Sequence, residues 1–311
     1  MSQVGVDGQL LTPAKRMMGK ASSSRKILRE KIRIKNRLVR ECLAEFIGTY
    51  MLMLLGISTV AQVVTNHDQK GTYLSIAMGY ASGVLFGIYS SVGVSGAHLN
   101  PAVSFSLCLL GRFSWKKLPF YCVAQFLGSF CAAATAFCVY YDAIHQYGNG
   151  NLTVTGPRGT AGIFATYPAT GISTRNAFIT EIVATAVLLI CILCVVDEKN
   201  AGAPPFMRPP LIAVSVLIIG IGLGANTGYA INPARDFAPR LFTYLAGWGV
   251  EVFTAGNGWW WIPLVAPMLG GPLGCLAYEL IVELHHEDAK VLEVRALPAT
   301  EEAEETAVHA V

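Results

Sequence analysis

Apolar residues in this chain gather in long runs that short polar stretches separate. Runs of about 20 apolar residues match the thickness of the hydrocarbon core of a membrane. The pattern therefore predicts a series of transmembrane helices. They are expected over residues 41–64, 72–92, 118–141, 177–196, 211–225 and 259–282.

Two shorter apolar segments begin with the same tripeptide, Asn-Pro-Ala. Asn is a strong helix N-cap, and Pro is favoured at the first helical position. Each tripeptide therefore predicts the start of a helix too short to cross the bilayer. A helix can start inside a membrane where its free end lines a water-filled cavity. The pair predicts a pore, formed around Asn100, Pro101, Ala102, Asn232, Pro233 and Ala234.

The two tripeptides lie in corresponding halves of the chain. Residues 40–141 and 177–284 each contain three predicted spans and one short helix, and residues 142–176 connect them. An odd number of spans makes the second half enter the membrane from the opposite side, which gives an inverted repeat. We therefore expect an all-α membrane protein, with six transmembrane helices and two re-entrant half-helices in a single channel domain over residues 40–284.

Composition and charge agree with this setting. Charged residues make up only 14% of the chain and hydrophobic residues 53%, whereas soluble domains carry about 25% charged residues. Residues 1–39 form a basic tail before the first span, which predicts a cytoplasmic N-terminus. A nucleic-acid-binding arm is the alternative, and the spans that follow at once argue against it. Residues 285–311 are polar and mostly acidic, and a flexible cytoplasmic tail is expected there.

The connecting segment over residues 142–176 is expected to lie outside the cell. It contains the acceptor Asn151-Leu152-Thr153, so Asn151 is a candidate glycosylation site. Both an occupied and an unoccupied acceptor are compatible with the sequence.

All eight cysteines lie in apolar segments, so no disulfide framework is expected. Cys191 and Cys194 form a CxxC motif without a second pair or a nearby His, which favours a packing role. No residue pattern points to a metal, a cofactor or a catalytic pairing.

The region over residues 40–284 resembles the aquaglyceroporins, the glycerol-conducting subclass of the aquaporin or major intrinsic protein family. The resemblance rests on both Asn-Pro-Ala motifs and on the Arg235-Asp236 pair after the second, where Asp236 is the subclass marker. Further matches are Arg240, Pro263-Leu264, Tyr140-Tyr141, Gly247-Trp248-Gly249 and Trp259-Trp260-Trp261. The resemblance implies the aquaporin fold, a homotetramer with one pore per protomer, and the plasma membrane as the location.

The resemblance also implies which residues select the solute. Tyr80, Gly220, Tyr229 and Arg235 would form the selectivity filter, wide because Gly220 stands where water-selective relatives have His. Arg235 can donate a fork of hydrogen bonds to two hydroxyls, while the tyrosines offer an apolar corner to a carbon backbone. The implied permeants are glycerol, water and urea, with protons and ions excluded. The implied ladder of pore carbonyls comprises Gly96, Ala97, His98, Thr227, Gly228, Tyr229 and Ala230.

The remaining polar residues have supporting roles in this interpretation. Glu45 and Glu181 are expected to accept hydrogen bonds from the two re-entrant loops, and Asp236 to pair within its loop or with Arg240. His98 is a candidate pH sensor because it stands beside a pore carbonyl and near Glu45. The alternative role for His98 is that of a hydrogen-bond donor that packs the loop.

Two other function classes remain open at this point. A coupled secondary transporter can also have inverted repeats and helices broken at the midplane, and ion-dependent or concentrative uptake would identify one. A non-conducting junctional or scaffold protein would show no flux at all. An enzyme is the least favoured class, because no catalytic group emerges.

Overall fold

The computed structural model describes residues 29–200 and 202–286. Of the described residues, 29–41 belong to one unit, in which Arg37 pairs with Glu41 at 2.8 Å. Residues 42–200 and 202–286 belong to the second unit, which is described by itself. The predicted tail over residues 1–39 is described only from residue 29. The predicted flexible tail over residues 285–311 is described only to residue 286.

Long helices dominate the described residues, and no strand occurs among them. Five helical segments are long and apolar enough to cross a membrane, and α8, with 16 residues, is shorter. The helices are α2 (Arg37–Thr65), α3 (Tyr73–Ser95), α5 (Leu118–Val139), α7 (Thr174–Val196), α8 (Arg208–Leu223) and α11 (Ile262–Ile281). Their positions match the six predicted spans to within a few residues.

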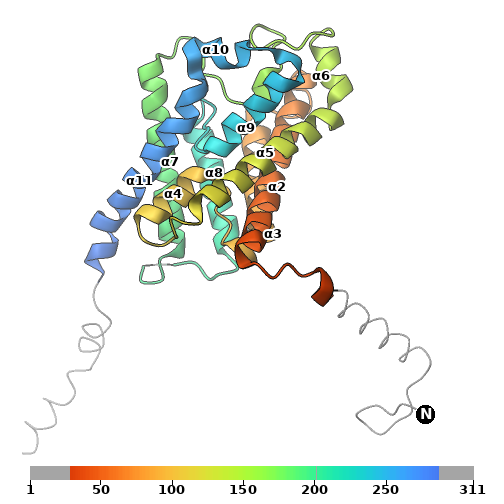
Figure 1. Cartoon of the computed structure of the whole chain (residues 1–311). Coiled ribbons are helices and arrows are strands. Elements are labelled where there is room, and N and C mark those ends of the chain that lie inside the picture. The colour runs from red at the N-terminus through yellow and green to blue at the C-terminus, as the bar shows by residue number, and fades with distance from the viewer. Residues whose placement is uncertain (1–28, 201, 287–311) are drawn as a thin grey trace, which may run out of the picture. The chain divides into compact units, whose positions relative to one another are not determined.

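The two Asn-Pro-Ala tripeptides begin the short helices α4 (Pro101–Leu109) and α9 (Pro233–Thr243). The side-chain oxygen of Asn100 accepts a hydrogen bond from the backbone N–H of Ala102 at 2.8 Å. That of Asn232 accepts one from Ala234 N–H at 3.0 Å. Both asparagines are therefore N-caps, as predicted. Figure 1 shows α4 and α9 among the long helices, and the two contact each other and α5 and α11.

Small residues allow the long helices to approach closely. A Cβ atom added at Gly83 of α3 would lie 2.5 Å from the carbonyl oxygen of Leu52 on α2. One added at Gly274 of α11 would lie 2.2 Å from the carbonyl oxygen of Ala186 on α7. Only glycine fits such contacts, which replace the hydrophobic effect as the force that packs helices in lipid.

The structure contains several short elements that the hydropathy pattern does not predict. The segment that connects the halves contains α6 (Tyr141–Tyr147) and the 3-10 turn η1 (Ala161–Ile163), and Asn151 is exposed just after α6. The chain between α9 and α11 forms the π-turn η2 (Tyr244–Trp248), α10 (Glu251–Gly258) and the 3-10 turn η3 (Trp259–Trp261). These elements hold loop residues against the functional site described below.

The described residues extend two residues past the predicted end of the channel domain. The turn η4 (Glu283–His285) follows α11, and His286 Nε2 lies 2.7 Å from a carboxylate oxygen of Asp197. Tyr278 donates a second hydrogen bond to Asp197 at 3.0 Å. Burial alone would raise the pKa of the Asp197 carboxyl, but the hydrogen bonds from His286, Tyr278 and the Lys199 N–H lower that pKa below its usual value.

Candidate pore

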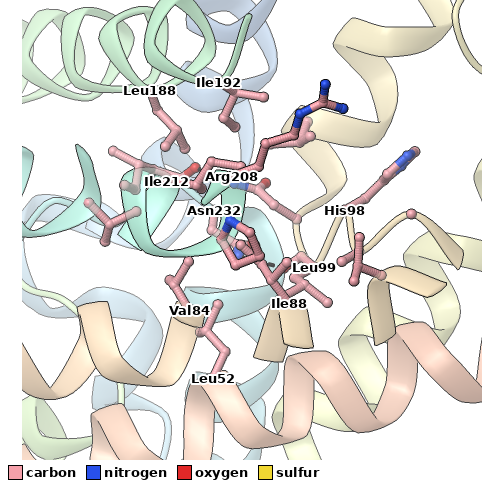
Figure 2. Close-up of a pocket in the computed structure, with 18 of the residues that line it drawn as sticks. Leu52, Val84, Ile88, His98, Leu99, Leu188, Ile192, Arg208, Ile212 and Asn232 are labelled. Atoms are coloured by element: carbon pink, nitrogen blue, oxygen red, sulfur yellow. Dashed lines mark hydrogen bonds between the residues drawn. The ribbon is translucent and has the colours of Figure 1, made fainter. Parts of the chain in front are cut away.

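A cavity of about 400 Å³ lies within the second unit. Most of its lining side chains are apolar, and Figure 2 shows several of them around Asn232. Arg208 at the start of α8 lines one end, and Tyr229 and Arg235 line the other. Gly220, which packs on Tyr229, lies twelve positions after Arg208 on α8, a rise of about 18 Å. The apolar walls include Leu52, Val84, Ile88, Leu188, Ile192 and Ile212.

The chain just before each Asn has an unusual backbone that repeats in the two halves. Ala97 and Leu99 have φ values of 57° and 54°, and Tyr229 and Ile231 have 41° and 44°. Non-glycine residues rarely adopt this left-handed region, which costs about 1–3 kcal/mol for each of them. Two strained residues at matching places in each loop indicate that the surroundings hold both loops in this form.

The buried carboxylate of Glu45 holds the first loop. It accepts hydrogen bonds from the backbone N–H groups of His98 at 2.9 Å and Leu99 at 2.8 Å. It also accepts from the side chains of Ser95 at 2.6 Å and Gln125 at 2.8 Å. Four donors surround the charge, so Glu45 is fully buried without being left unpaired.

Glu181 has the same position in the second half. Its two carboxylate oxygens accept from Ala230 N–H at 2.9 Å and Ile231 N–H at 2.8 Å. In a planar trans peptide the C=O points opposite to the N–H. The carbonyls that share these peptides therefore point away from the two carboxylates, and all four of their residues line the cavity. They belong to Ala97, His98, Tyr229 and Ala230.

The two asparagines also join the halves. Asn100 donates a side-chain N–H to the carbonyl of Ile231 at 2.8 Å, and Asn232 donates one to the carbonyl of Leu99 at 2.8 Å. Each side-chain amide has two hydrogens, so a second donor remains on each. Because both residues line the cavity, that donor is available to a solute in the lumen.

Tyr80, Tyr229 and Arg235 meet at one end of the cavity. The rings of Tyr80 and Tyr229 lie 6.2 Å apart at 77°, and the guanidinium carbon of Arg235 lies 4.6 Å from the centre of the Tyr80 ring. Arg235 also donates to the carbonyl of Phe164 at 3.2 Å, a residue that the sequence does not single out. The two tyrosine hydroxyls are buried and have no hydrogen-bond partner in the described part of the chain.

Gly220 packs against the ring of Tyr229, and its role in the filter stays a prediction. It does not line the cavity, and a Cβ atom added there would lie 2.8 Å from Cζ of Tyr229. The space left by the missing side chain therefore receives the Tyr229 ring. Of the predicted carbonyl ladder, Gly96 lines the cavity, and the roles of Thr227 and Gly228 stay predictions.

The helices, the paired loops and the Arg235 site are typical of one family, and the comparison with known proteins decides which. The family model of the major intrinsic proteins matches residues 32–278 of the chain. This chain belongs to the major intrinsic protein family. It is 48% identical to aquaporin-10 of Homo sapiens over 257 residues, which cover 83% of this chain and 85% of that protein. It is 46% identical to aquaporin-9 of Rattus norvegicus over 270 residues, or 87% and 92% of the two chains.

A solved structure agrees with the family. The X-ray structure of the aquaglyceroporin from Plasmodium falciparum matches this major intrinsic protein with a TM-score of 0.72 and 35% sequence identity. The match covers 79% of this chain and 98% of that one. The aquaporin fold and the membrane setting of this chain follow from these comparisons.

In this major intrinsic protein Asp236 is not among the residues that line the cavity. It links Thr166 of the connecting segment to Arg240 of α9, behind the lining residue Arg235. It accepts from Arg240 at 2.8 and 2.9 Å, and from the N–H and hydroxyl of Thr166 at 2.7 and 2.6 Å. Arg240 donates in turn to the carbonyl of Val252 at 2.7 Å and to that of Thr166 at 2.5 Å. Thr166 comes from the connecting segment, and no sequence pattern marks it.

His98 lines the cavity on the side of the first loop. Its Nδ1 lies 3.0 Å from the hydroxyl of Ser104 on α4, and its ring packs against Phe113 and Tyr121 with centroids 4.6 and 5.2 Å away. Its backbone N–H is bound by Glu45. These contacts fit a loop-packing role, and the place of His98 on the cavity wall leaves the pH-sensor hypothesis to be tested as well.

Proposed function

We propose that this protein is a passive membrane channel for glycerol and water. One observation carries the proposal: the cavity offers polar groups along the two loops and apolar side chains across from them. Carbonyls and asparagine amides can replace the hydrogen bonds that water gives to a hydroxyl, which lowers the cost of stripping a polar solute. The tyrosine rings can meanwhile receive the carbon atoms of glycerol.

The same groups account for the exclusion of protons and ions. Each asparagine N–H donates to a passing oxygen, which interrupts the chain of donors along which a proton would hop. The N-termini of α4 and α9 carry the positive ends of their helix dipoles. Arg235 adds a permanent charge at the end of the cavity lined by Tyr80 and Tyr229, so cations meet a positive potential in the lumen. An Arg and half-helix dipoles are the general explanation of proton and cation exclusion in aquaporin-type pores.

Purified protein in liposomes tests the function directly. Stopped-flow light scattering should show fast, non-saturating glycerol and water fluxes with a low activation energy, compared with empty liposomes. Uptake against a gradient or dependence on an ion would instead identify a transporter. The lining residues within the described part of the chain include no Asp or Glu that could hold a coupling ion. The absence of any flux would leave the scaffold alternative.

Several finer properties belong to the same proposal. Urea is smaller than glycerol and should also pass, but more slowly, because it has no hydrocarbon face to set against Tyr80 and Tyr229. We further propose a homotetramer in the plasma membrane, with both termini in the cytoplasm. Asn151 would then face the outside, where its exposed position leaves it accessible to glycosylation.

Mercury provides a test of the position of Tyr229. The wild type is expected to resist mercurial block at this site, because Tyr229 has no thiol. The Tyr229→Cys variant places a thiol on the lumen, so mercuric chloride should abolish most of its glycerol flux, and a reducing thiol should restore it. Flux that resists mercury in this variant would place Tyr229 away from the permeation path.

A comparison across pH tests His98. Its imidazole lies between Ser104, Phe113 and Tyr121, with the Glu45 carboxylate bound to its own backbone N–H. Histidine is the side chain that changes charge between pH 5 and 8. A protonated His98 carries a positive charge that the Glu45 carboxylate attracts, which would shift the imidazole within the loop. Glycerol flux is therefore expected to change with pH in the wild type and not in His98→Ala. Identical pH profiles would contradict the hypothesis.

A further inference from the structure

The rings of Tyr80 and Tyr229, at the Arg235 end of the cavity, lie against glycines of neighbouring segments. Tyr80 belongs to α3, and its ring packs on Gly56 of α2. A Cβ atom added at Gly56 would lie 2.3 Å from Cε1 of that ring and 2.5 Å from Cδ1. Real Cβ atoms essentially never approach a heavy atom this closely, so the Tyr80 ring lies in space that only glycine leaves open.

Tyr229 is held in the same way by glycines of α8 and the loop after it. Cβ atoms added at Gly220 and Gly224 would lie 2.8 Å from its Cζ and 2.7 Å from its Cδ1, respectively. Tyr73 also belongs to this slot, because its hydroxyl donates to the carbonyl of Gly220 at 3.0 Å. Both rings that line the lumen are therefore withdrawn into slots made by glycines.

Gly56 differs from the other parts of this arrangement because it does not touch the lumen. It is absent from the residues that line the cavity, and its contact with the permeation path runs through Tyr80. The same ring meets Arg235 at 4.6 Å and Tyr229 at 6.2 Å. A shift of the Tyr80 ring away from α2 therefore narrows the gap that separates this ring from Arg235 and Tyr229.

We propose that Gly56 is a positioning residue that sets the solute size limit of the channel, by letting the Tyr80 ring recede into α2. The inference rests on the proposed glycerol and water conduction. A methyl group at residue 56 would lie only 2.3 Å from the Tyr80 ring, so the ring must shift toward Arg235 until the two groups are at a normal contact distance. Water is narrower than glycerol, so glycerol flux falls before water flux does. Gly56 thus selects the solute without contacting it.

The Gly56→Ala variant tests this proposal in proteoliposomes. Glycerol permeability should fall at least about fivefold, because the displaced ring takes up part of the permeation path, with water permeability changed less than about twofold. Gly222→Ala is the matched control, because Gly222 of α8 has no heavy atom within 4 Å of an added Cβ. This control should keep both permeabilities.

A double variant separates the positioning role from general damage to the fold. In Gly56→Ala/Tyr80→Ala the displaced ring is gone, so glycerol flux should return at least to the wild-type value. Tyr80→Ala alone should also admit longer polyols such as erythritol, and this measurement holds even if Gly56→Ala fails to assemble. Equal losses of glycerol and water flux in Gly56→Ala, or no recovery in the double variant, would overturn the proposal. Wild-type protein that conducts no glycerol would instead overturn the proposed function.

Discussion

The Gly220→His variant should lose at least about tenfold of its glycerol permeability while it keeps most of its water permeability, a difference that corresponds to about 1.4 kcal/mol in barrier height. The reason is steric. The first atom of any side chain at residue 220 would lie 2.8 Å from Cζ of Tyr229, so the ring must leave its slot. The displaced ring and the new imidazole then share the space through which glycerol passes. Stopped-flow measurements of both solutes on the same liposomes give the ratio.

A graded series controls this experiment. Gly220→Ala adds only the Cβ atom and should lower glycerol flux less than Gly220→His does. Gly220→His/Tyr229→Ala removes the displaced ring and should recover part of the flux. Unchanged glycerol permeability in Gly220→His would contradict the assignment of this end of the cavity as the filter.

The Asp236→Ala variant should be the least stable of the single substitutions considered. Asp236 and Arg240 are both fully buried, and their side chains bond at 2.8 and 2.9 Å. Removal of the carboxylate leaves a buried guanidinium with only neutral carbonyl acceptors, and such a loss costs about 3–5 kcal/mol. Thr166 also loses the acceptor of its N–H and hydroxyl. Thermal unfolding of the detergent-solubilised protein, followed by tryptophan fluorescence, measures the effect.

The double variant Asp236→Ala/Arg240→Met is the matched control for this prediction. It removes the unpaired charge while it keeps an apolar side chain of similar length. It should therefore unfold at a higher temperature than Asp236→Ala alone. If Asp236→Ala were as stable as the wild type, the buried pair of Asp236 and Arg240 would contribute nothing to the stability of the fold.

The helices and the caps are predictable because their signals are local. The length of an apolar run is visible in the sequence, and so is the Asn-Pro pair that starts α4 and α9. The acceptor roles of Glu45 and Glu181 follow from their matching positions in the two halves. The contacts that the structure gives these residues are to the same two loops.

The remaining parts of the site depend on contacts between distant segments. No propensity marks Ala97 or Tyr229 for a left-handed backbone, since both conformations are imposed by the carboxylates that bind the next N–H groups. Phe164 and Thr166 lie in a connecting segment without periodicity, and only the folded chain brings them to Arg235 and Arg240. Gly220 suggests an opening from the sequence alone, which cannot tell that a tyrosine nine residues later fills its place.

The reciprocal bonds of Asn100 and Asn232 bear on how the chain is made. The acceptor for Asn100 is the carbonyl of Ile231, which lies 131 residues later in the sequence. When the first three spans have been synthesised, the loop that contains Asn100 is complete in sequence, but the carbonyl of Ile231 that Asn100 binds does not yet exist. The first loop can form this hydrogen bond only after the second half has been synthesised. The carbonyl of Leu99, which Asn232 binds, is by contrast already present when the second loop is made. Each repeat supplies a hydrogen-bond acceptor that the loop of the other repeat needs, so we expect the two loops to reach their final form together.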